Sequence, residues 1–185
     1  FHTPKHFTTM KKYAISSVSL LLWATFMLLN TNTFAQSSSD IFLQIKGSGQ
    51  GVLAGGVTEK GKEGSIKVVT CQNSNLSPRD AASGQATGKR QHCPITITKE
   101  IDKASPLLAK AFKDQENLPE VTLTYYRAGK KGAIEKWYTI TLKEVFISSL
   151  KSSTGGKNQT QEEISFTFQK IEWSWFDGGV TASDD

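Results

Sequence analysis

Apolar and polar residues alternate along most of the chain after residue 39, which is the pattern of β-strands that bury one face. Ile41, Leu43 and Ile45 share one phase of this pattern and predict a strand over 40–46. The same alternation predicts further strands over 66–71, 93–98, 121–125, 138–147 and 164–175. The chain therefore predicts a mainly β fold.

The last predicted strand changes phase within its length. Its apolar residues occupy even positions first and odd positions afterwards: Ile164, Phe166 and Phe168, then Ile171, Trp173 and Trp175. Side chains of a strand alternate with a period of two, so this change requires an extra residue. The sequence predicts a bulge or a sharp bend near Gln169 or Lys170.

One helix is predicted, with Ser105 as its N-cap and Pro106 at its first position. Its end is expected before Pro119. The apolar face consists of Leu107, Leu108, Ala111 and Phe112. Six or more strands with one flanking helix predict a mainly β (α+β) domain, a closed or nearly closed barrel or sandwich.

Two segments between the strands are rich in small or polar residues. The stretch from Gln72 to Gln91 has almost no apolar residue and predicts a long exposed loop, which in a domain of this size is functional or mobile. The glycine run 47–51 lacks the spacing and the following helix of a dinucleotide loop, so we expect no phosphate site there.

The N-terminal part has the layout of a bacterial Sec signal peptide. Lys11 and Lys12 precede an apolar run over 14–29, and small residues precede a cleavage site that we place after Ala35. An uncleaved membrane anchor is the alternative. The predicted organisation is upstream residues 1–9, a signal peptide 10–35, a linker 36–39, a folded domain 40–176 and a flexible tail 177–185. A secreted or periplasmic protein without membrane association follows.

The net charge of +5 belongs partly to the leader. Residues 1–35 contain three lysines and no acid, and without them 19 basic residues face 17 acidic ones. A net charge of +2 gives no reason to expect nucleic-acid binding, which requires a concentrated basic surface.

The sequence contains no recognisable catalytic, metal or cofactor motif. His92 and Cys93 are adjacent in a predicted strand, so they point to opposite faces and cannot act as a nucleophile and its base. Glu100, Asp102 and Glu144 each stand near a lysine and are interpreted as solvated charges. We expect neither an enzyme nor a cofactor.

The two cysteines, Cys71 and Cys93, both follow the leader. In an oxidising compartment a disulfide between them is expected, which would stabilise the fold by about 3 kcal/mol in the chain-entropy model. Two buried free thiols are the alternative. Near the C-terminus, Trp173, Trp175 and Phe176 predict core or subunit-interface positions, with a ligand platform as the alternative.

Three motifs in register over 40–176 resemble the Hcp family of bacterial type VI secretion systems. The first, at 97–106, has the family's Lys-x-x-Asp-Lys-x-Ser-Pro run, formed by Lys99, Asp102, Lys103, Ser105 and Pro106. The second, at 140–149, contains Thr141, Leu142, Lys143, Glu144, Val145 and Ser148. The third, at 162–171, is similar to the family's closing strand.

This resemblance implies a two-sheet β-barrel with one flanking helix and a mechanical function. The chain would form a homohexameric ring, and rings would stack into a tube that a contractile sheath propels, with effector and spike proteins as further partners. The loop from Gln72 to Gln91, Trp173 and Trp175 would be candidate interface residues.

The leader sets this chain apart from the family, whose members are ordinarily loaded from the cytoplasm. A periplasmic or extracellular binding module that keeps the barrel but not the tube role is therefore the second functional hypothesis.

Overall fold

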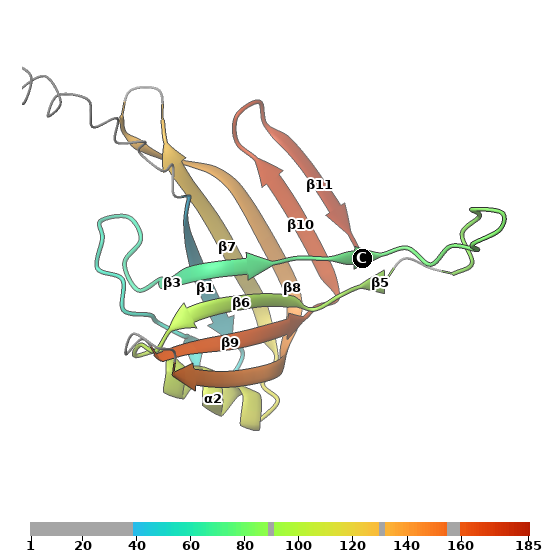
Figure 1. The fold of residues 1–185 in the computed structure, drawn as a ribbon. Helices are drawn as coiled ribbons and strands as arrows, with labels where there is room; N and C mark the ends of the chain where they lie inside the picture. Colours follow the sequence, from blue (N-terminus) through green and yellow to red (C-terminus); the bar gives the residue numbers. More distant parts are fainter. Residues whose placement is uncertain (1–38, 89–90, 130–131, 155–159) are drawn as a thin grey trace, which may run out of the picture. The chain divides into compact units, whose positions relative to one another are not determined.

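The described part of this computed structural model, residues 39–88, 91–129, 132–154 and 160–185, is built around a closed ring of six antiparallel strands (Figure 1). The ring closes because β8 pairs with β7 on one side and with β9 on the other. Around the ring the strands are β8 (Ile134–Thr154), β7 (Leu118–Ala128), β1 (Asp40–Gly47), β3 (Ile66–Gln72), β6 (Ile95–Glu100) and β9 (Thr160–Thr167). The predicted mainly β barrel with one flanking helix is confirmed.

Alternating apolar residues of these strands fill the barrel. Leu43 on β1 lies opposite Ile66 on β3 and Leu123 on β7, and all three are fully buried. Burying one such side chain contributes about 1.5–3 kcal/mol relative to leaving it in water. The other strands contribute the same kind of residue: Ile95, Ile97, Val121, Leu142, Ile164 and Phe166.

The long strand β8 serves both halves of the barrel because it bends. Up to Lys143 it pairs with β7 and with β10 (Lys170–Trp175), and from Phe146 onward it pairs with β9. Glu144 has a φ of 49°, and the register shifts between Ile147 and Ser149. A positive φ and a bulge both turn a strand, so together they redirect β8 from one half of the barrel to the other.

The phase change in the last predicted strand corresponds to a break between β9 and β10. Phe168 and Gln169 lie outside both strands, at a bend, and this confirms the prediction of a bend near Gln169. Beyond the bend the chain pairs with β8 outside the closed ring.

The predicted flexible tail is instead a strand. β11 (Val180–Asp184) pairs with β10 along its whole length, from Trp175 opposite Val180 to Ile171 opposite Asp184. Gly178 and Gly179 have positive φ values, as a tight turn between two strands requires. The tail prediction is wrong because the apolar pattern of 180–184 is too short and too weak to indicate a strand.

The helix α2 (Ser105–Lys113) packs against β8 and buries Leu108 and Ala111. Its N-cap is Ala104, which corrects the prediction of Ser105, and Phe112 is 40% exposed, which corrects its place on the buried face. The Ser105 hydroxyl is engaged inside the protein instead. The helix ends before Pro119, as predicted.

A short turn joins β1 to β2 (Gly51–Val52) and is fastened by Glu116. One oxygen of its carboxylate accepts hydrogen bonds from the backbone nitrogens of Gly49 and Gln50, at 2.7 and 2.8 Å. The hydrogen bond from the Gln50 backbone, opposed by some desolvation, lowers the pKa of Glu116. A Cβ at Gly47 would lie 2.5 Å from the same carboxylate, so glycine is required there.

Candidate interaction surfaces

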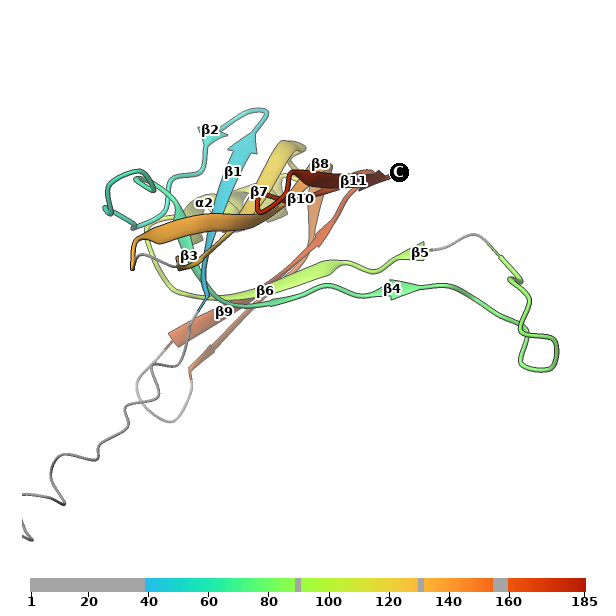
Figure 2. The ribbon, with the colours of Figure 1, turned by 90° about the horizontal axis from the view of Figure 1, so that it is seen from above.

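The predicted loop from Gln72 to Gln91 is largely a projecting arm of β-structure. β4 (Asn75–Leu76) pairs with β5 (Gln91–His92), and Arg79 forms an isolated bridge with Ala86. Figure 2 shows this arm in green, running on from β3 and β6 and away from the helix. The side chains of 72–88 are exposed, so the prediction of an exposed segment is confirmed and its description as a loop is corrected.

Asp80 fixes the turn at the tip of the arm. Its Oδ1 accepts hydrogen bonds from the backbone nitrogens of Ala82 and Ser83 and from the Ser83 hydroxyl, at 2.7–3.1 Å. The bond from the Ser83 backbone is the main reason why the pKa of Asp80 is lowered. The tip therefore has defined local structure although it is exposed to solvent.

His92 connects the base of the arm to the last strand. Its Nε2 lies 3.1 Å from Oδ2 of Asp184 on β11, and its Nδ1 lies 3.0 Å from Oδ1 of Asn75 on β4. The imidazole also packs against Phe168, with ring centroids 5.3 Å apart. These contacts are structural, and they give His92 a positioning role that its sequence neighbours did not indicate.

The predicted disulfide between Cys71 and Cys93 is not formed. Both cysteines are free and half-buried. In the β3–β6 register Cys71 pairs with Ile97, four residues beyond Cys93. Four residues of a strand span about 13 Å, whereas a disulfide requires Cα atoms within about 7 Å. Burial raises the pKa of the Cys71 thiol, which hydrogen-bonds to Tyr125.

A cluster of aromatic side chains covers the start of β8 and its neighbours. The β7–β8 register shifts between Tyr125 and Tyr126, which leaves Trp137 as an extra residue on β8. Such a bulge brings consecutive side chains toward one face, and the rings of Trp137 and Tyr138 are stacked at 5.7 Å. Trp175 meets Trp137 edge-on at 5.0 Å. Sequence periodicity could not reveal this cluster, because the bulge breaks it.

The two tryptophans predicted as interface residues occupy different environments. Trp173 is partly buried, packs against the core and lies between Ile140 on β8 and Ala182 on β11. Trp175 is 37% exposed, and the following Phe176 is 46% exposed. Trp175 and Phe176 are therefore the residues of this group that offer apolar surface.

The first family-like motif surrounds a buried charge. Lys99 on β6 is fully buried, and its Nζ lies 2.9 Å from Asp102 and 3.1 Å from Glu162 on β9. It also donates to the Ser105 hydroxyl at 3.0 Å, and that hydroxyl donates to Glu162 at 2.7 Å. Desolvating one charge costs several kcal/mol, so this network is favourable only when every member has its partner.

Asp102 links the network to two loops. Its carboxylate accepts hydrogen bonds from the backbone nitrogens of Ala104 and Gly56, at 3.0 and 3.1 Å. The interpretation of Asp102 as a solvated charge is therefore wrong. The remaining motif residues, Lys103 and Pro106, are exposed. Glu162 was missed as a partner because it lies 63 residues from Lys99.

The second motif lies in β8, where it forms the corner described above. Leu142 and Val145 are buried, Thr141 and Lys143 are half-buried, and Ser148 is exposed. Lys143 is paired with Glu120 across β7, and the hydrogen bond from Lys143 to this carboxylate raises the pKa of Lys143. Glu144 is exposed and accepts a hydrogen bond from Asn117 at 2.6 Å. The motif is structural.

Within the described ranges, no group of three or more His, Cys, Asp or Glu residues is arranged to hold a metal ion. No helix of that part of the chain is long and apolar enough to cross a membrane.

The fold defines a small antiparallel barrel whose exposed features are an arm of strands and a group of aromatic side chains. A family model described as "Type VI secretion system effector, Hcp" matches residues 42–175. The chain belongs to the Hcp family.

Relatives and solved structures agree with this assignment. The "Major exported protein" of Pseudomonas aeruginosa is 36% identical over 160 residues, covering 78% of this chain and 93% of that protein. A crystal structure of an Hcp protein superposes with a TM-score of 0.76 at 26% identity, covering 80% of this chain and 99% of that one. A mutant of Hcp1 from the E. coli EAEC 042 pathovar gives 0.74 at 29% identity, covering 80% and 98%.

Proposed function

We propose that this protein is a self-assembling tube component of a type VI secretion system, and that six copies form a ring. The observation that carries the proposal is the family match over 42–175, which spans the whole closed barrel. Contacts between copies that repeat around an axis and close produce a ring. The function is then mechanical, and its chemistry is the chemistry of interfaces.

The exposed strands support such a role. Closing the ring of six strands leaves that ring without a free edge, but β11 and the arm lie outside it. Unpaired strand edges are templates for pairing with another chain. Residues 180–183 of β11 are exposed and contain no charge and no proline that would discourage pairing.

The arm is the proposed contact between successive rings. It projects from the barrel as two paired strands, its tip has a defined turn, and its side chains bury little inside their own chain (Figure 2). An element that contributes so little to its own fold is suited to a contact with another copy. Stacked rings would form the channel or surface on which effector proteins travel.

Sedimentation velocity of the purified chain tests ring formation. The expected main species has six times the mass of one chain and persists on dilution to micromolar concentration. A species that remains a monomer at high concentration would contradict the proposal, and would favour the binding module considered above.

We also propose that the leader directs the chain out of the cytoplasm. Its support is the sequence pattern of 10–35, which lies outside the described residues, together with the printed name of the exported relative. Mass spectrometry of protein expressed in a Gram-negative host checks it. The expected product begins after Ala35 and is recovered from the periplasm or medium, whereas an uncleaved product in the cytoplasm would overturn this assignment.

A further inference from the structure

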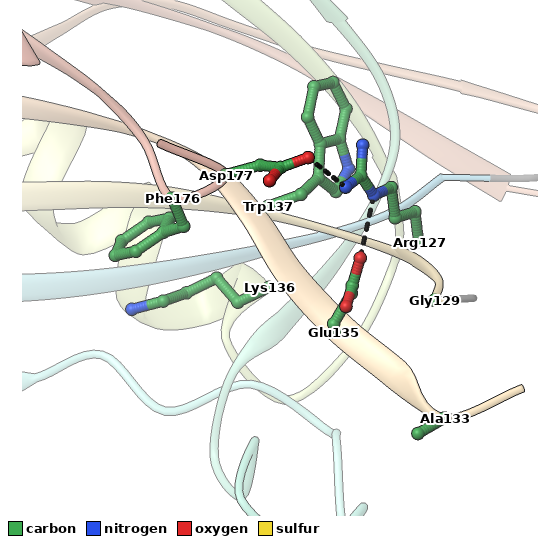
Figure 3. A pocket seen from close by; sticks show the side chains of 8 residues that line it. All are labelled: Arg127, Gly129, Ala133, Glu135, Lys136, Trp137, Phe176 and Asp177. Carbon is green, nitrogen blue, oxygen red and sulfur yellow. Dashed lines mark hydrogen bonds and ion pairs between the residues drawn. The ribbon is translucent and has the colours of Figure 1, made fainter. Parts of the chain in front are cut away.

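A hollow of about 460 Å³ lies between the β7–β8 hairpin and the turn that joins β10 to β11. This volume lies in the range of pockets that bind small ligands. Figure 3 shows its lining side chains, which come from three segments: Arg127 and Gly129, then Ala133, Glu135, Lys136 and Trp137, and finally Phe176 and Asp177.

The rim of the hollow is held in place by Arg127. Its Nε donates to Glu135 at 3.1 Å and its Nη2 donates to Asp177 at 3.3 Å, and the guanidinium lies 5.6 Å from the ring centroid of Trp137 (Figure 3). A Cβ at Gly129 would come within 2.8 Å of the Glu135 carboxylate, so glycine permits this arrangement. The site is organised without a ligand, which lowers the cost of binding one.

The aromatic faces of the hollow are occupied by cations. Lys136 Nζ lies 4.1 Å from the ring centroid of Phe176, and Arg127 covers Trp137. A sugar ring would need a free aromatic face for stacking, so the arrangement disfavours a glycan. The cations instead leave donors available, because Nη1 of Arg127 has no hydrogen-bond partner among the described residues.

Charge selects the ligand further. Glu135 and Asp177 are both paired with Arg127, whereas Lys136 has no carboxylate within ion-pair distance in the described part of the chain. Lys136 is thus the unneutralised charge of the hollow, and it lies beside the exposed, apolar Phe176. A carboxylate next to an apolar side chain complements this pair.

We propose that the hollow binds a short acidic peptide segment of a partner protein, with a carboxylate at Lys136 and an adjacent apolar side chain against Phe176. The carboxylate belongs either to an acidic side chain or to a C-terminus. This site requires one copy of the chain only, so the inference goes beyond ring formation and does not depend on it.

Tryptophan fluorescence titration of the full chain with three capped peptides tests the inference. The peptides are acetyl-Ala-Asp-Phe-Ala-amide, its Asn counterpart, and acetyl-Ala-Ala-Phe with a free carboxylate. We expect the Asp peptide to bind about threefold to fivefold more tightly than the Asn peptide, the range of one exposed ion pair. Tighter binding of the third peptide than of the Asn peptide would assign the carboxylate to a C-terminus.

Two variants separate the site from general charge effects. Lys136→Met keeps most of the side-chain stem and removes the charge, and we expect it to abolish the preference for Asp over Asn. Lys113→Met, on the exposed last turn of α2, is the matched control and should leave the preference unchanged. Equal affinity for the Asp and Asn peptides, equal effects of the two variants, or equally tight binding of acetate alone would overturn the proposal.

Discussion

β3 and β6 continue directly into the arm, yet the barrel and the arm use their side chains in opposite ways. Inside the barrel, Ile66, Val68, Ile95 and Ile97 are buried against the other strands. From Gln72 to residue 88 the side chains are exposed, and Leu76 is 59% exposed. The comparison teaches that stability is concentrated in the barrel. The arm is therefore free to contact another molecule.

The largest expected effect comes from breaking the buried network of the barrel. Glu162→Ala leaves the Lys99 charge buried with one carboxylate fewer, and we expect it to lower the free energy of unfolding by about 3 kcal/mol. Urea denaturation followed by circular dichroism measures it.

The neighbouring residue provides a matched control. Glu163 is paired with Lys151 at 3.0 Å, almost the separation of Lys99 and Glu162, but both partners are exposed. We expect Glu163→Ala to cost less than about 1 kcal/mol. Equal losses in the two variants would show that burial of the charge is not what matters.

A smaller effect is expected from Glu116, which fastens a turn at the barrel. Its pKa is lowered in the folded protein, so its contribution is present above its unfolded pKa of about 4.3 and is lost as the pH falls through the folded value. We expect Glu116→Gln to cost about 1 kcal/mol at pH 7 and almost nothing at pH 2.5. Unfolding curves at the two pH values check this, and a pH-independent loss would contradict it.

Shortening the arm should change stability less still. Leu76 lies opposite Gln91 in the β4–β5 register, so residues 77–90 can be replaced by Asn-Gly, which forms a two-residue hairpin turn. We expect a change of less than about 1 kcal/mol in the free energy of unfolding, since the removed residues 77–88 are exposed. Rings should form but no longer stack, as particle length in electron micrographs would report. Loss of folding would refute the division between barrel and arm.

The smallest expected effect is that of a reductant. Because Cys71 and Cys93 are free and separated by the register, dithiothreitol should leave the unfolding midpoint unchanged. Thiol titration of the denatured protein should give two thiols per chain. A result of none would restore the disulfide between them.

Alternation of apolar residues was sufficient to predict the barrel strands, and the phase change between Phe168 and Ile171 was sufficient to predict the bend after β9. The sequence gave no such help with Lys99, because a lysine between threonine and glutamate is indistinguishable from a surface residue until Glu162 is brought beside it. The Trp137 bulge interrupts the very period on which prediction depends.

The exposed surfaces were predictable in part. The polar composition of 72–91 indicated exposure, but not that two short strands pair within it. The predicted interface residues Trp173 and Trp175 differ in exposure because β11 lies beside β10, and β11 itself was not predicted. Long-range pairing, rather than local pattern, determines which of these residues reach the surface.

Negative-stain electron microscopy of the purified chain tests the central claim most directly, because it shows the symmetry of the assembly. The account predicts class averages with sixfold symmetry and a central opening, retained by the variant with the shortened arm. Particles of single-chain size, or averages with no rotational symmetry, would contradict it.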